Sequence, residues 1–178
     1  MSKILFPLKT VSLLIISLLL SCNQKSPEIN QEEIQVAVSQ TLDDWHDAAA
    51  RADFKAYFGL MDQESVFIGT EATEIWDKTA FENYSKPHFD RGKAWSFSTI
   101  QRNIYVDPTG EFVWFDELLK TSMGICRGSG VVVFKPQLNQ WKIKHYVLSI
   151  DIPNEKISET IALKKEWDSL FLVSAKKQ

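Results

Sequence analysis

Two strand-forming runs joined by a short loop constrain the fold of this chain more than any other feature. The second run, residues 141–149, alternates between two sets of side chains. One set is Trp141, Ile143, His145, Val147 and Ser149, and the other is Lys142, Lys144, Tyr146 and Leu148. A period of two is typical of a strand whose two faces have different surroundings. The loop 136–140 is short enough to join this strand to the run 127–134 as a hairpin.

The rest of the chain places helices first. Apolar residues at three- and four-residue spacing predict a helix over residues 32–52, and Asp53 is a suitable N-cap for a second helix. A short strand over 66–69 comes next. A third helix, continuous or broken, is expected over 74–89, where Pro87 ends or bends it.

Strands follow the helices. We expect them over residues 94–106 and 112–120, joined by the turn 107–110, and then the hairpin and a terminal helix over 155–175. Antiparallel strands with early helices on one face make an α+β domain. The set of alternating residues that contains His145 is expected on the concave face of this sheet.

The N-terminus predicts export. Lys3 and Lys9 precede an apolar run over residues 11–20, which is too short for a membrane span and is typical of a secretory signal. The tetrapeptide Leu19-Leu20-Ser21-Cys22 resembles the bacterial lipobox, and this resemblance implies cleavage before Cys22 and its acylation. The alternative is an ordinary secretory signal followed by a chance cysteine.

The expected organisation therefore has four parts. Residues 1–21 are the signal peptide, 22–31 a flexible tether, 32–152 the folded domain and 153–178 the C-terminal helix. We expect the protein in the bacterial cell envelope, anchored to a membrane by lipid on Cys22.

Charge and cysteine usage narrow the function classes. The chain has a net charge of −3, and loss of residues 1–21 would leave 18 basic and 23 acidic residues, a net charge of −5. Nucleic acid is therefore not an expected partner, because phosphate binding needs a basic face. With Cys22 acylated, Cys126 has no partner for a disulfide and is expected to be a buried apolar residue.

Several segments resemble the SnoaL-like branch of the nuclear transport factor 2-like superfamily. Residues 42–46 and 52–58 resemble its opening helix pair, 66–70 its first strand, and 128–132 with 141–149 its closing strand pair. The resemblance covers roughly residues 30–150 and implies a cone-shaped fold, in which a curved antiparallel sheet packs against N-terminal helices. Many relatives carry a second histidine two positions beyond the first, where this chain has Val147.

The resemblance implies a pocket between the helices and the concave face of the sheet. We expect ligand contacts from bulky and polar side chains: Trp45, His46, Tyr57, Trp76, Trp95, Trp114, Arg127 and His145. The alternative for each aromatic side chain is plain packing in the core, which an α+β domain requires of its large apolar residues.

Two adjacent carboxylates, Asp116 and Glu117, lie in an otherwise apolar predicted strand. Alternation sends one of them inward, where it needs a partner, and Arg127 on the next strand is the expected one. His145 is the candidate general base, oriented by the carboxylate of Asp116 or Glu117. The alternative is that His145 is a core residue whose hydrogen bonds are satisfied. No metal site is expected from three scattered histidines, and no cofactor is expected.

Three functions remain open, because this fold hosts many activities. The first is a lipid-anchored domain that binds a small, partly apolar molecule. The second is a cofactor-independent dehydratase, isomerase or cyclase that uses His145 with Asp116 or Glu117. The third is a non-catalytic scaffold. A homodimer through the outer sheet face is also expected, with Val131, Val133, Tyr146 and Leu148 as the outward patch. The alternative is that the C-terminal helix covers this face within one chain.

Overall fold

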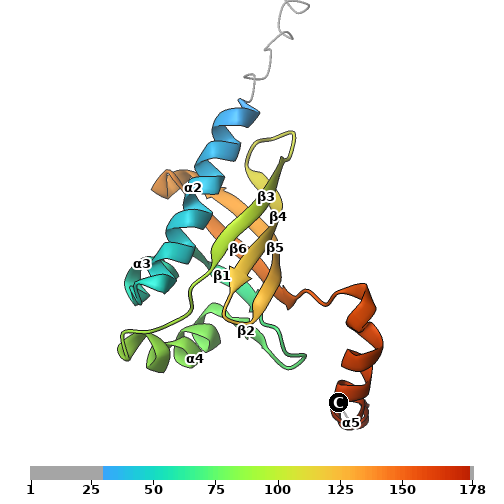
Figure 1. Ribbon diagram of the computed structural model, residues 1–178. Coiled ribbons are helices and arrows are strands. Elements are labelled where there is room, and N and C mark those ends of the chain that lie inside the picture. Colours follow the sequence, from blue (N-terminus) through green and yellow to red (C-terminus); the bar gives the residue numbers. More distant parts are fainter. Residues whose placement is uncertain (1–29, 177–178) are drawn as a thin grey trace, which may run out of the picture. The chain divides into compact units, whose positions relative to one another are not determined.

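The computed structural model of the chain describes residues 30–176 (Figure 1). The predicted signal peptide, the acylation site at Cys22 and the tether as far as residue 29 lie outside the described residues. Residues 31–178 are assigned to one compact unit. Every buried hydrophobic side chain in the described part lies between Val38 and Leu148, so the hydrophobic core of the described residues lies within this unit.

The two N-terminal helices form where the sequence predicts them. Helix α2 spans Gln31–Ala50, and it buries Val38, Leu42 and Trp45 on one face. Helix α3, Phe54–Gly59, begins after Asp53, whose carboxylate accepts a hydrogen bond from the Ala56 amide at 2.9 Å. An oxygen at the N-cap satisfies one of the amides that a helix start leaves without a partner.

The third predicted helix is partly wrong. Residues Ile75–Asp77 form the short strand β2, and helix α4 begins only at Lys78 and ends at Asp90. Asp77 ends the strand and caps the helix, since its side chain accepts from the Ala80 amide at 2.8 Å. Pro87 lies inside α4, and the helix ends three residues beyond it.

Six strands form one curved, unclosed sheet in the order β2-β1-β6-β5-β4-β3. Apart from β2, they are β1 (Met61–Ile68), β3 (Ser98–Val106), β4 (Phe112–Thr121), β5 (Gly124–Lys135) and β6 (Gln140–Ile150). The β5–β6 hairpin and the α+β class are confirmed. The strands β1 and β6 run parallel, and all other neighbours are antiparallel. Helix α2 contacts β3 and β6, while α4 contacts β1 and β2.

A β-bulge in β6 reverses the predicted faces of its second half. Val131 pairs with His145 and Val132 with Ile143, so Lys144 has no partner on β5. Because one extra residue shifts the alternation, Ile143, Tyr146 and Leu148 all point inward. His145 pairs through Val131 with the exposed Trp114, which places it on the outer face. The expected concave position of His145 is therefore wrong.

A second bulge lies in β3. Thr99 pairs with Leu119 and Gln101 with Leu118, which leaves Ile100 as the extra residue. The shift carries Gln101 outward and turns the side chain of Arg102 inward, to 6 % exposure. These two bulges decide which polar side chains enter the interior.

The C-terminal helix α5 spans Ile157–Ala175 and follows the short 3-10 helix η2 (Asn154–Lys156). It was predicted from residue 155, and none of its residues is buried. Within residues 30–176 no helix is long and apolar enough to cross a membrane.

Candidate functional site

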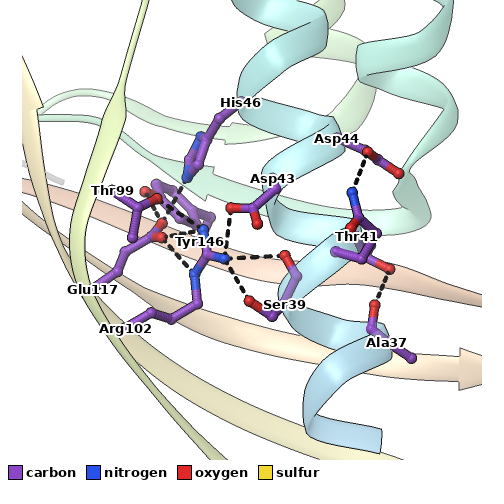
Figure 2. A network of polar contacts seen from close by, with 11 residues as sticks. Ala37, Ser39, Thr41, Asp43, Asp44, His46, Thr99, Arg102, Glu117 and Tyr146 are labelled. Carbon is purple, nitrogen blue, oxygen red and sulfur yellow. Dashed lines mark hydrogen bonds and ion pairs between the residues drawn. The ribbon is translucent and has the colours of Figure 1, made fainter. Parts of the chain in front are cut away.

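Glu117 is the centre of a buried polar network (Figure 2). Its side chain is completely buried. One carboxylate oxygen, Oε1, lies 2.8 Å from Nε2 of His46 and 3.0 Å from the hydroxyl of Tyr146. The other oxygen, Oε2, accepts from Nε and Nη2 of Arg102 at 2.9 and 2.8 Å. The carboxylate is thus held by four donors from α2, β3 and β6.

Three local features bring these side chains together. His46 lies on the buried face of α2, next to Trp45. Arg102 is the direct cross-strand partner of Glu117 in the β3–β4 pairing, once the bulge at Ile100 has turned it inward. Tyr146 reaches Glu117 across β5 at Gly128, where a Cβ atom would lie 2.2 Å from the tyrosine hydroxyl. Only a residue without a side chain leaves room for this crossing.

The guanidinium of Arg102 is also fully engaged. Nη1 donates to the Ser39 carbonyl and hydroxyl, both at 3.0 Å, and to Asp43 at 2.8 Å. Nη2 donates to the Thr99 hydroxyl at 3.1 Å. A buried arginine is tolerated when its donors are satisfied in this way. The arginine therefore ties α2 to β3 and β4.

Electrostatics keep the carboxylate ionised. Burial by itself raises the pKa of Glu117, but the hydrogen bond and charge of His46 and the charge of Arg102 outweigh it and lower the pKa below its usual value. Burial, and then the adjacent carboxylate, raise the pKa of Tyr146 well above the usual value. Since Glu117 is an acceptor, Nε2–H of His46 and the Tyr146 hydroxyl both donate to it.

An aromatic pocket lies beside this network and is separated from it by two phenylalanines. The pocket has a volume of about 230 Å³. Its apolar lining consists of Phe67, Trp76, Phe81, Tyr84, Trp95, Phe97, Met123 and Leu148, and its polar lining of Gly69, Thr70, Glu74, His88 and Ser122. The ring of Phe97 lies 5.6 Å from that of His46, and the ring of Phe67 lies 5.6 Å from that of Tyr146. The network therefore supports the pocket wall from behind.

The predicted aromatic contacts divide between pocket, core and surface. Trp76 and Trp95 line the pocket. Trp45 and Tyr57 stack on each other at 4.8 Å in the core behind it, and each is 1 % exposed. Trp114 lies on the outer face of the sheet, where its ring stacks on Tyr105 at 5.7 Å.

The predicted polar residues are also separated. Glu117 points inward, whereas Asp116 accepts hydrogen bonds from Asn103 and Tyr105 on the outer face. Arg127 was expected as the partner of the inward carboxylate, and this is wrong. It is half-exposed and its nearest carboxylate is Asp151, at 3.3 Å. His145 and Glu117 lie on opposite faces of the sheet, so the structure does not bring this pair together.

Sequence reasoning missed Arg102 and the inward position of Tyr146. Both depend on β-bulges, and a bulge leaves no local mark in a run of strand-forming residues. The doublet Gly128 and Gly130 in β5 is the one available signal, because glycine inside a strand indicates a close approach of another group. Among residues 30–176, no group of three or more His, Cys, Asp or Glu side chains is arranged to hold a metal ion.

Comparison with known protein families gives one match for this chain. The sequence model described as the SnoaL-like domain matches residues 38–153. No curated protein is similar enough in sequence to match the chain.

Solved structures share the fold at low sequence identity. An NTF2-like protein from Cytophaga hutchinsonii has 14% identity and a TM-score of 0.55, covering 69% of this chain and 100% of its own. A putative dehydratase of the NTF2-like family from Streptomyces avermitilis has 12% identity and a TM-score of 0.57, covering 70% and 100%. A domain of unknown function with a cystatin-like fold from Nostoc punctiforme has 13% identity and a TM-score of 0.58, covering 82% and 98%. At such identities the likeness shows the fold alone.

Proposed function

Because this chain belongs to the SnoaL-like domain family, we propose that it binds a small, largely apolar molecule in its aromatic pocket. The pocket itself carries this proposal. Six of its lining side chains are aromatic, and its polar groups are few, which is the usual make-up of a small-molecule site. An apolar protein cavity of roughly 150 Å³ holds benzene. A volume of about 230 Å³ therefore suits a ligand with one or two rings.

Ligand binding is favoured over catalysis because the paired side chains best suited to acid–base chemistry, Glu117 and His46, are not accessible from the pocket. Glu117 is completely buried and His46 is 5 % exposed, and both lie behind Phe97 and Phe67. A general base has to come within hydrogen-bond reach of the substrate atom that it deprotonates. A dehydratase- or isomerase-type enzyme would therefore have to rely on Glu74 and His88, which line the pocket without contacting each other.

Titration of the chain with small aromatic molecules, from benzyl alcohol to indole, tests the binding proposal. We expect saturable quenching of tryptophan fluorescence and a higher melting temperature. Ser122→Trp places a large ring at the exposed rim of the pocket and should abolish both effects. Ser169→Trp, at an exposed position of helix α5, is the matched control and should keep them, because no residue of that helix lines the pocket. Equal responses in the two variants would overturn the proposal.

The domain is also proposed to be held at a bacterial membrane by lipid on Cys22. The tetrapeptide Leu19-Leu20-Ser21-Cys22 supports this, and so does the short apolar run before it. Mass spectrometry of the membrane fraction should find an acylated chain that begins at Cys22. In Cys22→Ser the acyl mass should disappear, and an unmodified soluble wild-type chain would contradict the proposal.

A homodimer through the outer face of the sheet is a third proposal. Its support is the exposed aromatic cluster Tyr105, Phe112 and Trp114, which lies next to Val131 and Val133. Tyr146 and Leu148, expected in this patch, point inward instead. Exposed apolar clusters of this kind are uncommon on monomers. Sedimentation at micromolar concentration should give a dimer for residues 31–178 and a monomer for Trp114→Glu. A wild-type monomer would refute the proposal.

A further inference from the structure

Four lysines gather where β1 begins and the β5–β6 hairpin lies beside it. They are Lys78 at the start of α4, Lys135 at the end of β5, and Lys142 and Lys144 in β6. Two carboxylates, Asp62 and Glu64, lie among them. The cluster therefore carries a local excess of positive charge in a chain whose net charge is −3.

The two carboxylates are used by only two of the four lysines. Lys135 and Lys144 contact the two oxygens of Asp62 at 2.6 and 3.0 Å, and Lys144 also contacts Glu64 at 2.8 Å. Asp62 accepts a further hydrogen bond from the Glu64 amide at 3.1 Å. The acceptor capacity of Asp62 is thereby largely taken up by Lys135 and Lys144.

Lys78 and Lys142 have no such partner. Lys142 is 8 % exposed and donates to the Gly59 carbonyl, while Lys78 donates to the Met61 carbonyl at 3.2 Å. Among residues 30–176, no carboxylate forms an ion pair with either ammonium group. Each ammonium has three N–H groups and uses one of them on a backbone carbonyl. Burial, together with the like charge of Lys78, lowers the pKa of Lys142.

Both side chains line the same cavity, which lies apart from the aromatic pocket. It has a volume of about 360 Å³. Lys135 also lines it, and Gln63 and Gln137 add two amide side chains that can donate. The cavity thus presents three ammonium groups and two amides, against the single carboxylate of Asp62, which is already engaged.

We propose that this cavity binds a phosphate group between Lys78 and Lys142. A dianion placed there accepts the free N–H groups of both ammoniums and offsets their mutual repulsion. The carbonyl contacts alone do neither. Neither ammonium group has an ion-pair partner among the described residues, and the carboxylate that attracts Lys142, that of Asp62, is already held by Lys135 and Lys144. The phosphate comes either from a free phosphate compound or from a phospholipid headgroup, and the chemistry of recognition is the same.

The binding of orthophosphate to residues 31–178 tests this proposal. Equilibrium dialysis with labelled orthophosphate, at ionic strength held constant with sodium chloride, measures the dissociation constant. Lys78→Gln should weaken binding roughly tenfold, as expected for loss of one charge-assisted contact. Lys86→Gln is the matched control, because Lys86 lies on the same helix α4 but pairs with the exposed Asp90. It should leave the dissociation constant unchanged.

Two further measurements keep the proposal falsifiable. Lys142→Gln should weaken binding by a similar factor. Because Lys142→Gln also loses the contact with Gly59, a second variant, Lys78→Arg, tests charge alone. Lys78→Arg keeps the positive charge at the more exposed of the two positions and should therefore retain phosphate binding. Equal dissociation constants for wild type, Lys78→Gln and Lys86→Gln would overturn the proposal. Vesicles of phosphatidylcholine, prepared with and without phosphatidic acid, then separate the two sources of phosphate. If the protein is retained more strongly on the vesicles that contain phosphatidic acid, and Lys78→Gln loses this difference, the site binds a headgroup. Binding of orthophosphate alone assigns it to a free compound.

Discussion

The Glu117 network and the aromatic pocket lie on either side of two phenylalanine rings, yet they are built in opposite ways. In the network, four donors hold one buried carboxylate and every described group is engaged. In the pocket, large aromatic side chains surround about 230 Å³ of space that no side chain fills. Only the second region offers room and contact surface to another molecule.

The comparison separates residues that stabilise the fold from residues that can contact a ligand. Histidine, glutamate, tyrosine and arginine in a cluster resemble a catalytic site, but here their hydrogen bonds join α2 to three strands. Well-packed proteins fill their interiors to crystal-like density, so an apolar space of this size is an exception. Lack of access, rather than residue type, distinguishes the structural region from the binding region.

The largest expected effect tests whether the network is structural. Glu117→Ala leaves the buried Arg102 and His46 without their carboxylate and should lower the free energy of unfolding by about 3–5 kcal/mol. Asp116→Ala, the adjacent carboxylate on the outer face, should lower it by about 1 kcal/mol or less. Urea unfolding of both variants measures the difference. Similar losses would break the distinction between the two positions.

The two histidines provide a second test. His46→Ala removes a buried hydrogen bond to an ionised carboxylate and should cost about 1.5–3 kcal/mol. His145→Ala changes a half-buried position on the outer face and should cost less than about 1 kcal/mol. Thermal melts with and without a pocket ligand complete the test, since both variants should keep the ligand-induced shift. Loss of that shift in His145→Ala alone would restore His145 to the binding site.

A fall in pH should lower the free energy of unfolding through the carboxylates of Asp62 and Glu117, neither of which lines the aromatic pocket. Although burial raises the pKa of Asp62, the hydrogen bonds from Lys135 and Lys144 outweigh it and lower the pKa to about 2. A depressed folded-state pKa stabilises the protein above the unfolded-state value, and this stability is lost as the pH falls from about 5 to about 2. Asp62 should contribute about 2 kcal/mol. Glu117 acts in the same direction. Urea unfolding of wild type and Asp62→Asn at pH 7 and pH 3 measures this: the variant should lose less stability on acidification.

The smallest expected effect concerns a pocket side chain that folding does not need. Tyr84 is 45 % exposed and stacks on Trp76, so Tyr84→Ala should cost about 1 kcal/mol of stability while weakening ligand binding severalfold. Tyr105 provides the matched control, since it is 43 % exposed and stacks on Trp114 on the outer face. Tyr105→Ala should lose similar stability and keep full ligand affinity. If both variants bind equally, Tyr84 does not belong to the site.

Much of the architecture follows from local patterns. The helix periodicity before residue 52, the cap at Asp53, the turn after Val106 and the β5–β6 hairpin all appear where the sequence predicts them. The family resemblance, carried by residues from the opening helix to the closing strands, is confirmed by the match over residues 38–153. The early part of the third helix was wrong because Ile75–Asp77 pairs with β1, and pairing with a distant strand overrides local preference.

The types of most helices and strands, and their order along the chain, were therefore determined by the sequence itself, because local periodicity depends on neighbours only a few positions away. The composition of the site was decided by tertiary structure. A single extra residue at Lys144 turned Tyr146 inward and His145 outward, and another at Ile100 brought Arg102 opposite Glu117. A strand's alternation has a period of two, so one unpaired residue exchanges its faces. Whether that residue is accommodated depends on the partner strand, the helix above it and the space at Gly128, none of which is near it in sequence.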